Sequence, residues 1–113
     1  MALEEYQNMI TQIFEKAKAK MPEIASWNKV YQFETEEGDQ FYIEISNGEL
    51  KISEGKHPSP IATLKMSRQV LEQVLKGELD AMKAFMTGKM KITGNVFDTA
   101  NLRKMINAGL GKE

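Results

Sequence analysis

The sequence predicts an α+β fold in which five mostly antiparallel strands carry helices on one face. Two observations lead to this prediction. Residues 3–21 and the segments after residue 67 repeat apolar side chains every three or four positions, as amphipathic helices do. Residues 30–66 largely alternate apolar and polar side chains, as strands with one buried face do. With 113 residues and 42% hydrophobic content, the chain is expected to form one domain over residues 1–113.

The first helix is predicted from an apolar stripe and from its charges. Acidic residues Glu4 and Glu5 lie in its first turn and lysines lie near its end, which suits the helix dipole. Pro22 is expected to stop it. Its stripe consists of Leu3, Tyr6, Ile10, Ile13, Phe14, Ala17 and Met21.

Three strands at residues 30–35, 40–45 and 49–53 should follow as an antiparallel meander. Phe41, Ile43 and Ile45 are expected on one face of the middle strand, with polar side chains between them. Glu37-Gly38-Asp39 and Asn47-Gly48 supply the turns, and Asn-Gly is a strong signal for a two-residue hairpin loop.

The second half of the chain should add two strands and three helices. A loop at residues 55–60 leads to a strand at 61–66, and Ser67 is positioned to cap a helix that ends at Gly77. Asp80 opens a short helix that Gly88 closes, before a strand at 89–93. Asn95 is expected to cap the last helix, whose stripe is Leu102, Met105, Ile106 and Leu110.

Charge and composition argue against several classes of function. The net charge of −1 disfavours a nucleic-acid binder, which usually has a strong basic excess. Without cysteine there is no disulfide, no thiolate nucleophile and no cysteine-ligated zinc, which fits a reducing compartment. The acidic, amphipathic start does not resemble a signal peptide, and no apolar run approaches the ~20 residues of a membrane span. We therefore expect a cytoplasmic protein.

The sequence shows no catalytic or metal-binding motif. His57 is the only histidine and lies in a polar loop, where an exposed side chain is a simpler interpretation than a general base or a ligand. The acidic turn Glu36-Glu37-Gly38-Asp39 lacks the spacing of a calcium loop, which favours a solvated hairpin tip. The glycines of residues 88–94 are misplaced for a phosphate-binding loop. We expect no enzyme activity, no metal and no cofactor.

Methionines in the second half give the sequence an unusual apolar pattern. Five of them are predicted on inward faces, and a flexible thioether side chain suits a surface that must fit several shapes. They indicate either a deformable cavity for a lipid-like ligand or an irregular, filled core. They are Met66, Met82, Met86, Met90 and Met105.

One stretch resembles a known family. The segment LKGELD at residues 75–80, followed by FMTGKMKITGN at 85–95 and then Leu102, is similar to the signature of the sterol-carrier-protein-2 family. The order of a helix, a three-stranded meander and a further strand resembles that family as well. The similarity therefore covers nearly the whole chain, and its specific part is about twenty residues long.

The resemblance implies an apolar tunnel between the sheet and its helices. It implies non-catalytic binding and transfer of a fatty acid, fatty acyl-CoA, phospholipid or sterol-like lipid. Because it lacks a peroxisomal tail, the sequence resembles free-standing prokaryotic members of the family. This resemblance favours an acyl chain over a sterol as the ligand. The apolar positions that would line the tunnel are Phe14, Phe33, Ile43, Ile45, Leu64, Leu71, Leu75, Met82, Phe85, Met86, Ile92, Leu102, Met105 and Ile106.

Two questions about partners stay open at this point. Lys65, Arg68, Lys89 and Lys91 would attract a carboxylate, a phosphate or a membrane surface in transient contact, or they form a solvated face. The chain would be a monomer or a homodimer. The alternative to a lipid carrier is a protein-interaction or dimerisation module with the same fold and a filled core, and a small thioesterase is a third reading.

Overall fold

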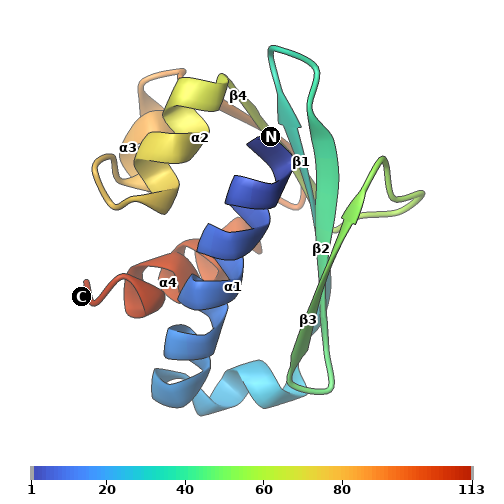
Figure 1. Ribbon diagram of the computed structural model, residues 1–113, viewed down its shortest axis with the longest axis vertical. Coiled ribbons are helices and arrows are strands. Elements are labelled where there is room, and N and C mark those ends of the chain that lie inside the picture. The colour runs from blue at the N-terminus through green and yellow to red at the C-terminus, as the bar shows by residue number, and fades with distance from the viewer. Residues whose placement is uncertain (1, 113) are drawn as a thin grey trace.

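The computed structural model describes residues 2–112 and contains four α-helices, one 3₁₀ helix and five strands. Figure 1 shows the helices gathered on one face of the sheet. In chain order the elements are α1 (Ala2–Lys20), η1 (Pro22–Ser26), β1 (Asn28–Thr35), β2 (Gln40–Ser46), β3 (Glu49–Glu54), β4 (Ala62–Met66), α2 (Arg68–Leu75), α3 (Ala81–Met86), β5 (Met90–Gly94) and α4 (Thr99–Gly109).

The sheet is mixed, with strand order β3-β2-β1-β4-β5. The first three strands form the predicted antiparallel meander, and β5 pairs antiparallel with β4. Only β1 and β4 run parallel, with Phe33 beside Leu64 in register. The predicted α+β fold with a mostly antiparallel five-stranded sheet is therefore confirmed.

Helix α1 covers the half of the sheet that the meander forms. Its Tyr6 ring stacks on Phe41 at 5.7 Å between centroids, and Phe41 stacks on Phe33 at 5.1 Å. Helix α4 packs against α1 so closely that a Cβ at Gly109 would lie 2.2 Å from the carbonyl oxygen of Ile13. This half of the interior is filled by side chains from α1 and the strands.

Local signals explain most element boundaries. Asn47 and Gly48 both have positive φ, 55° and 74°, as the predicted two-residue hairpin loop requires. The Ser67 hydroxyl accepts a hydrogen bond from the Val70 N–H, and the Asp80 carboxylate accepts one from the Lys83 N–H. Both predicted caps are confirmed.

The start of α4 differs from the prediction. Asn95 caps a turn, because its side chain accepts a hydrogen bond from the Asp98 N–H at 3.0 Å, and the helix begins only at Thr99. Asp98 occupies the N-cap position, but its side chain makes no capping hydrogen bond. Its carboxylate is turned instead toward Lys29 and Tyr31 on β1.

The opposite face of the sheet holds one buried polar side chain. Gln32 is buried, and its amide donates to the carbonyl oxygens of Phe41 at 3.1 Å and Gly55 at 2.9 Å. Its Oε1 accepts from the His57 N–H at 2.9 Å. Gln32 therefore fastens the loop at residues 55–60 to the sheet.

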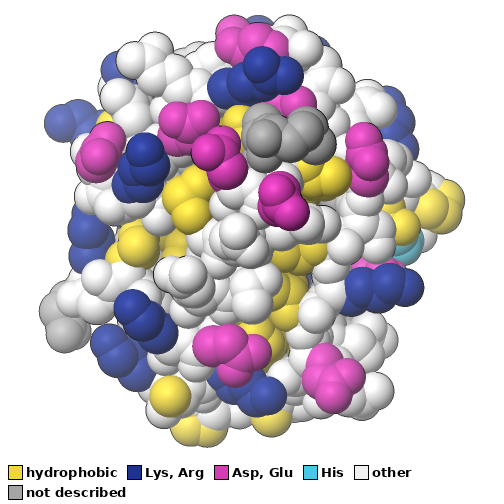
Figure 2. Space-filling view, in the orientation of Figure 1, with side chains coloured by type: hydrophobic (Ala, Val, Ile, Leu, Met, Phe, Trp, Pro, Cys, Tyr) yellow, Lys and Arg dark blue, Asp and Glu magenta, His cyan; other side chains and the backbone are white. Residues whose placement is uncertain are grey.

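Charges of both signs are interspersed on the molecular face in Figure 2. Small hydrophobic areas lie between them in this view.

Candidate functional site

A cavity of about 250 Å³ lies between the sheet and the helices of the second half of the chain. The sheet contributes side chains from β1, β4 and β5, and α2, α3 and α4 form the rest of the wall with the loop before α4. The lining residues are Phe33, Leu64, Met66, Leu71, Val74, Leu75, Ala81, Met82, Phe85, Met90, Ile92, Val96, Phe97, Thr99, Ala100, Leu102, Arg103 and Ile106.

The wall is almost entirely apolar. Sixteen of its eighteen residues have hydrocarbon or thioether side chains, and Thr99 and Arg103 are the exceptions. The Thr99 hydroxyl already donates to the Val96 carbonyl oxygen at 2.5 Å. The wall thus offers a ligand an apolar surface and one cation.

Nine of the fourteen predicted site residues line this cavity. They lie on all three of its strands and on α2, α3 and α4, although they are far apart in the sequence. These nine are Phe33, Leu64, Leu71, Leu75, Met82, Phe85, Ile92, Leu102 and Ile106.

Four predicted residues are buried elsewhere in the core. Phe14, Ile43 and Ile45 are fully or almost fully buried but do not line the cavity, because α1 fills the space over the meander. Met105 is buried on the side of α4 that carries Gly109, four residues later, and this side faces α1. The structure therefore separates these four from the cavity.

Met86 is the fifth exception, and the expectation that it faces inward is wrong. Its side chain is 76% exposed. Helix α3 has only six residues and places Ala84 in the core, where the Ala84 carbonyl oxygen accepts from the Lys89 N–H. Met86 is the last residue of this helix and lies beyond the cavity wall.

Several wall residues were not predicted from the sequence. Val96 and Phe97 form an apolar pair directly after the Gly94-Asn95 corner, a position where a loop usually carries polar residues. Arg103 lies three residues after Ala100 and three before Ile106, so helical spacing places it on the same side of α4. The apolar pair and the helical spacing of Arg103 are both visible in the sequence, but the apolar stripe of α4 predicted only Leu102, Met105 and Ile106 as site residues.

The four large hydrophobic residues exposed in the described structure belong to two segments at the edge of this cavity. Met82 and Met86 lie on α3, and Val96 and Phe97 lie on the loop before α4. Phe97 is 93% exposed. We call these four residues the apolar rim; three of them also line the cavity.

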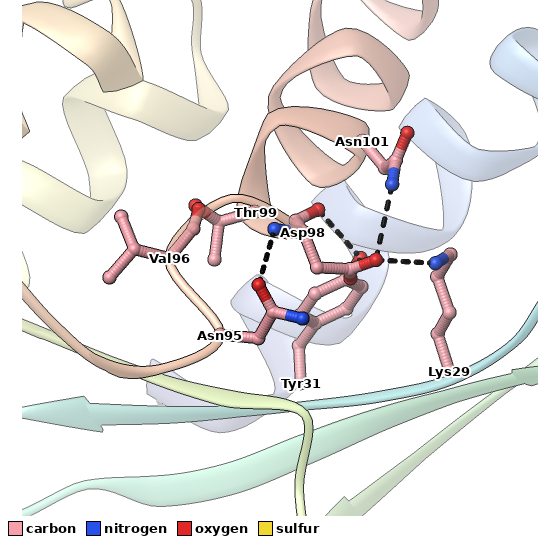
Figure 3. Close-up of polar contacts among 7 residues, drawn as sticks. All are labelled: Lys29, Tyr31, Asn95, Val96, Asp98, Thr99 and Asn101. Atoms are coloured by element: carbon pink, nitrogen blue, oxygen red, sulfur yellow. Dashed lines mark hydrogen bonds and ion pairs between the residues drawn. The ribbon is translucent and has the colours of Figure 1, made fainter.

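A polar cluster fixes the loop that carries Val96 and Phe97 (Figure 3). The Tyr31 hydroxyl donates to Asp98 Oδ2 at 2.6 Å, and Lys29 Nζ lies 2.7 Å from Asp98 Oδ1. Asn101 Nδ2 also donates to Oδ1, at 3.2 Å. In Figure 3 the Val96 side chain points away from this cluster. Asp98 thus ties the loop to β1, and Val96 and Phe97 of the same loop line the edge of the cavity.

The cluster perturbs two pKa values. Burial raises the pKa of Asp98, but hydrogen bonds from Lys29 and Tyr31 outweigh it and hold the pKa of the carboxyl below its usual range. Burial and the hydrogen bond to Asp98 raise the pKa of Tyr31. The cluster is therefore a neutral phenol bonded to a charged carboxylate, which Lys29 also contacts.

The other polar candidates of the sequence have structural roles away from the cavity. His57 lies edge-on to the Tyr42 ring, and its Nδ1 accepts from the Ser59 N–H at 3.0 Å. Asp39 pairs with Arg68 at 2.6 Å, and this hydrogen bond holds the pKa of the Asp39 carboxyl below its usual range. Arg68 is therefore engaged in holding the β1–β2 hairpin to the start of α2.

Within residues 2–112, no cluster of three histidine, aspartate or glutamate side chains is arranged to hold a metal ion. No helix in this part of the chain is long and apolar enough to cross a membrane.

Comparison with known proteins identifies the family. The model of the SCP-2 sterol transfer family matches residues 10–107. The chain belongs to this family. A relative of similar sequence is the hydroxysteroid dehydrogenase-like protein 2 of Rattus norvegicus, 33% identical over 81 residues. The match covers 68% of this chain but only 15% of that protein.

Several solved structures share the fold. The sterol carrier protein domain 2 of Helicoverpa armigera matches with a TM-score of 0.74 at 21% identity, over 95% of this chain and 88% of that one. The sterol carrier protein 2 of Aedes aegypti in complex with palmitate, a C16 fatty acid, matches with a TM-score of 0.67 at 21% identity, over 91% and 94% of the two chains. The sec-alkylsulfatase Pisa1 of Pseudomonas sp. matches with a TM-score of 0.62 at 20% identity, over 69% of this chain and 13% of the enzyme.

Proposed function

We propose that this protein binds a single acyl chain in the cavity and carries it without chemical change. One observation carries the proposal: sixteen of the eighteen side chains around a cavity of about 250 Å³ are apolar. The palmitate complex of the Aedes aegypti family member supports the choice of a fatty acyl ligand. The nine predicted residues that line the cavity would contact the chain, together with Met66, Val74 and Met90.

The energetics suit a reversible carrier. Burial of each methylene contributes about 0.8 kcal/mol, so ten methylenes contribute about 8 kcal/mol. Ordering the chain and the protein reduces this gain. Since about 8 kcal/mol corresponds to a Kd of about 1 μM before this reduction, the Kd should be weaker than about 1 μM, which permits both capture and release.

The size of the cavity favours one chain over a bulky ligand. About 250 Å³ exceeds the ~150 Å³ of a protein cavity that holds benzene, and it lies below the roughly 300–1,000 Å³ of most ligand pockets. A sterol or a two-chain phospholipid would need the wall to move outward. The flexible side chains of Met66, Met82 and Met90 permit a modest adjustment to chains of different length.

A carrier fits the chemistry of the wall better than an enzyme. General acid–base catalysis needs titratable groups within hydrogen-bond reach of the substrate. Arg103 is the only charged residue of the wall, and His57 lies on another part of the fold. The alternative of an interaction module presupposed a filled core, and the cavity counts against it.

We further propose that the ligand enters and leaves while the apolar rim touches a lipid surface. The rim lies in residues 81–97, which contain Lys83, Lys89 and Lys91 and no acidic residue, in a chain whose net charge is −1. Apolar side chains flanked by lysines favour the interface of an anionic membrane. Replacing Met86 and Phe97 with serine should weaken sedimentation with vesicles of phosphatidylglycerol and phosphatidylcholine, and unchanged sedimentation would place the contact elsewhere.

A pair of tryptophan variants on β5 tests the cavity as the binding site. Ile92 points into the cavity, whereas the next residue, Thr93, is exposed on the other face of the strand. Ile92→Trp should fill the cavity with an indole ring and reduce binding of a fluorescent fatty acid at least tenfold. Thr93→Trp adds the same ring to the same strand and should bind like the wild type.

The two variants and the wild type together show where the fatty acid binds and whether it binds at all. Equal affinity in all three proteins would move the site away from the cavity. No binding or displacement by palmitate in the wild type would refute the carrier function itself.

A further inference from the structure

Arg103 is a lone cation in an apolar wall. Its side chain lines the cavity from α4, beside Thr99 and Ile106, one helical turn away on either side. The other charged groups near the start of this helix are already engaged, because Asp98 pairs with Lys29 and Lys104 pairs with Glu23. None of the ion pairs found within residues 2–112 includes Arg103.

The guanidinium is also incompletely hydrogen-bonded. Arg103 Nε is buried and has no hydrogen-bond partner in the part of the chain that the structure describes. A buried donor without a partner is costly, and the cost is larger for a charged group. Arginine presents its donors as a fork that matches the two oxygens of a carboxylate or a phosphate.

We propose that Arg103 binds the anionic head group of the ligand. This inference rests on the proposed function, and it defines the ligand further as one alkyl chain that ends in a carboxylate or a phosphate. The apolar wall holds the chain, and Nε and one Nη of Arg103 donate to two oxygens of the head group once the guanidinium turns toward the cavity. A neutral lipid such as a fatty alcohol has no such charge and gains little from Arg103.

The test compares ligands that differ only in the head group. Palmitate, hexadecyl phosphate and 1-hexadecanol are titrated into the wild type and into R103M at pH 8, where the fatty acid is ionised. The wild type should prefer both anions to the alcohol. R103M should bind both anions roughly 10- to 100-fold more weakly, the range expected for hydrogen bonds between charged groups, and should bind hexadecanol as before.

Two further variants separate head-group binding from other effects. K104M removes one positive charge from the neighbouring residue, whose side chain pairs with Glu23 outside the cavity, and should leave all affinities unchanged. R103K keeps the charge without the fork and should retain part of the preference for anions. Unchanged hexadecanol binding shows in the same experiment that R103M is folded and that its cavity is intact.

A spectroscopic measurement reports the contact itself. The carbonyl carbon of ¹³C-labelled palmitate is followed by NMR while the pH is varied. The bound carboxyl should ionise at lower pH in the wild type than in R103M, because Arg103 stabilises the carboxylate.

The remaining outcomes distinguish a failure of the proposed role of Arg103 from a failure of the proposed carrier function. Equal anion affinity in the wild type and R103M, with binding intact, would overturn the role of Arg103 and leave the carrier function standing. An equal loss for anions and alcohol, or the same loss in K104M, would also overturn it. If only one of the two anions is bound through Arg103, the head group is that one. If the wild type binds none of the three ligands, the carrier function fails first.

Discussion

The hydrogen bond between Tyr31 and Asp98 should be among the strongest single contributions to stability in this fold. Tyr31 is fully buried, its hydroxyl lies 2.6 Å from Asp98 Oδ2, and Lys29 binds the other carboxylate oxygen. Asp98→Ala would leave the buried phenol with only the main-chain carbonyl oxygen of residue 98, 3.4 Å away, and the lysine without its counter-ion. We expect the free energy of unfolding to fall by about 2 to 4 kcal/mol, since a hydrogen bond to a charged group contributes roughly 1.5 to 3 kcal/mol.

A double-mutant cycle isolates this contact. Tyr31→Phe should cost about 1 to 2 kcal/mol, because Asp98 keeps Lys29, and the double variant should cost less than the sum of the two single changes. Urea unfolding at pH 7, followed by circular dichroism and by the fluorescence of Trp27, gives each value. A coupling energy of about 1 to 3 kcal/mol is expected. A coupling energy within about 0.5 kcal/mol of zero, the value for independent sites, would show that the two side chains do not stabilise each other.

The stability that Asp98 contributes should depend on pH. The pKa of Asp98 is lower in the folded protein than in the unfolded chain, where it is about 3.9. Its contribution is therefore present above that value and is lost as the pH falls through the folded pKa. The difference in stability between the wild type and Asp98→Ala should be largest near pH 7 and should shrink below about pH 4.

Three further substitutions test other parts of the account. Tyr6→Phe should stabilise the protein by up to about 1 kcal/mol, because the Tyr6 hydroxyl is buried without a hydrogen-bond partner in residues 2–112. Burial raises the pKa of Tyr6 to about 12, so the wild type should lose stability from about pH 10 upward, where the unfolded phenol ionises. Urea unfolding at rising pH should show a smaller loss of stability in Tyr6→Phe than in the wild type. Gly109→Ala should cost about 1 to 3 kcal/mol, since its Cβ would lie 2.2 Å from the Ile13 carbonyl oxygen, and Asn107→Ala on the same helix is the control; similar melting temperatures for the two variants would contradict this close packing. Gln32→Met should cost about 2 to 3 kcal/mol and speed hydrogen exchange at the His57 amide, because two carbonyl groups and that amide lose their partner; unchanged exchange would mean that the loop does not depend on Gln32.

Local signals made the fold predictable. The Asn47-Gly48 turn, the Ser67 and Asp80 caps and the alternation around Ile43 each act over a few residues, and all appear in the structure. The start of α4 was misplaced because a long-range contact competes with a local one. Asp98 is drawn to Lys29 and Tyr31, which lie 69 and 67 positions away, and so it does not cap the helix.

The site was predictable only in part, because a stripe of apolar residues does not say what it faces. Phe14 and Met105 lie on apolar stripes like those of Leu71 and Leu102, but α1 and α4 pack against each other there and leave no space. Met86 was expected inside because helical spacing places it one turn after Met82, yet α3 ends at that residue. Arg103 was not predicted to line the cavity, because a charged residue beside the apolar stripe of a helix is usually solvated.

The most direct test of the central claim is an isotope-filtered NOE experiment with ¹³C-labelled protein and unlabelled palmitate. If the acyl chain binds in the cavity, its methylene protons should give NOEs to the side chains of Met66, Leu71 and Leu102, which line the cavity. NOEs confined to exposed residues outside the cavity wall, such as Met86, or to the α1 side of the core at Phe14, would contradict cavity binding.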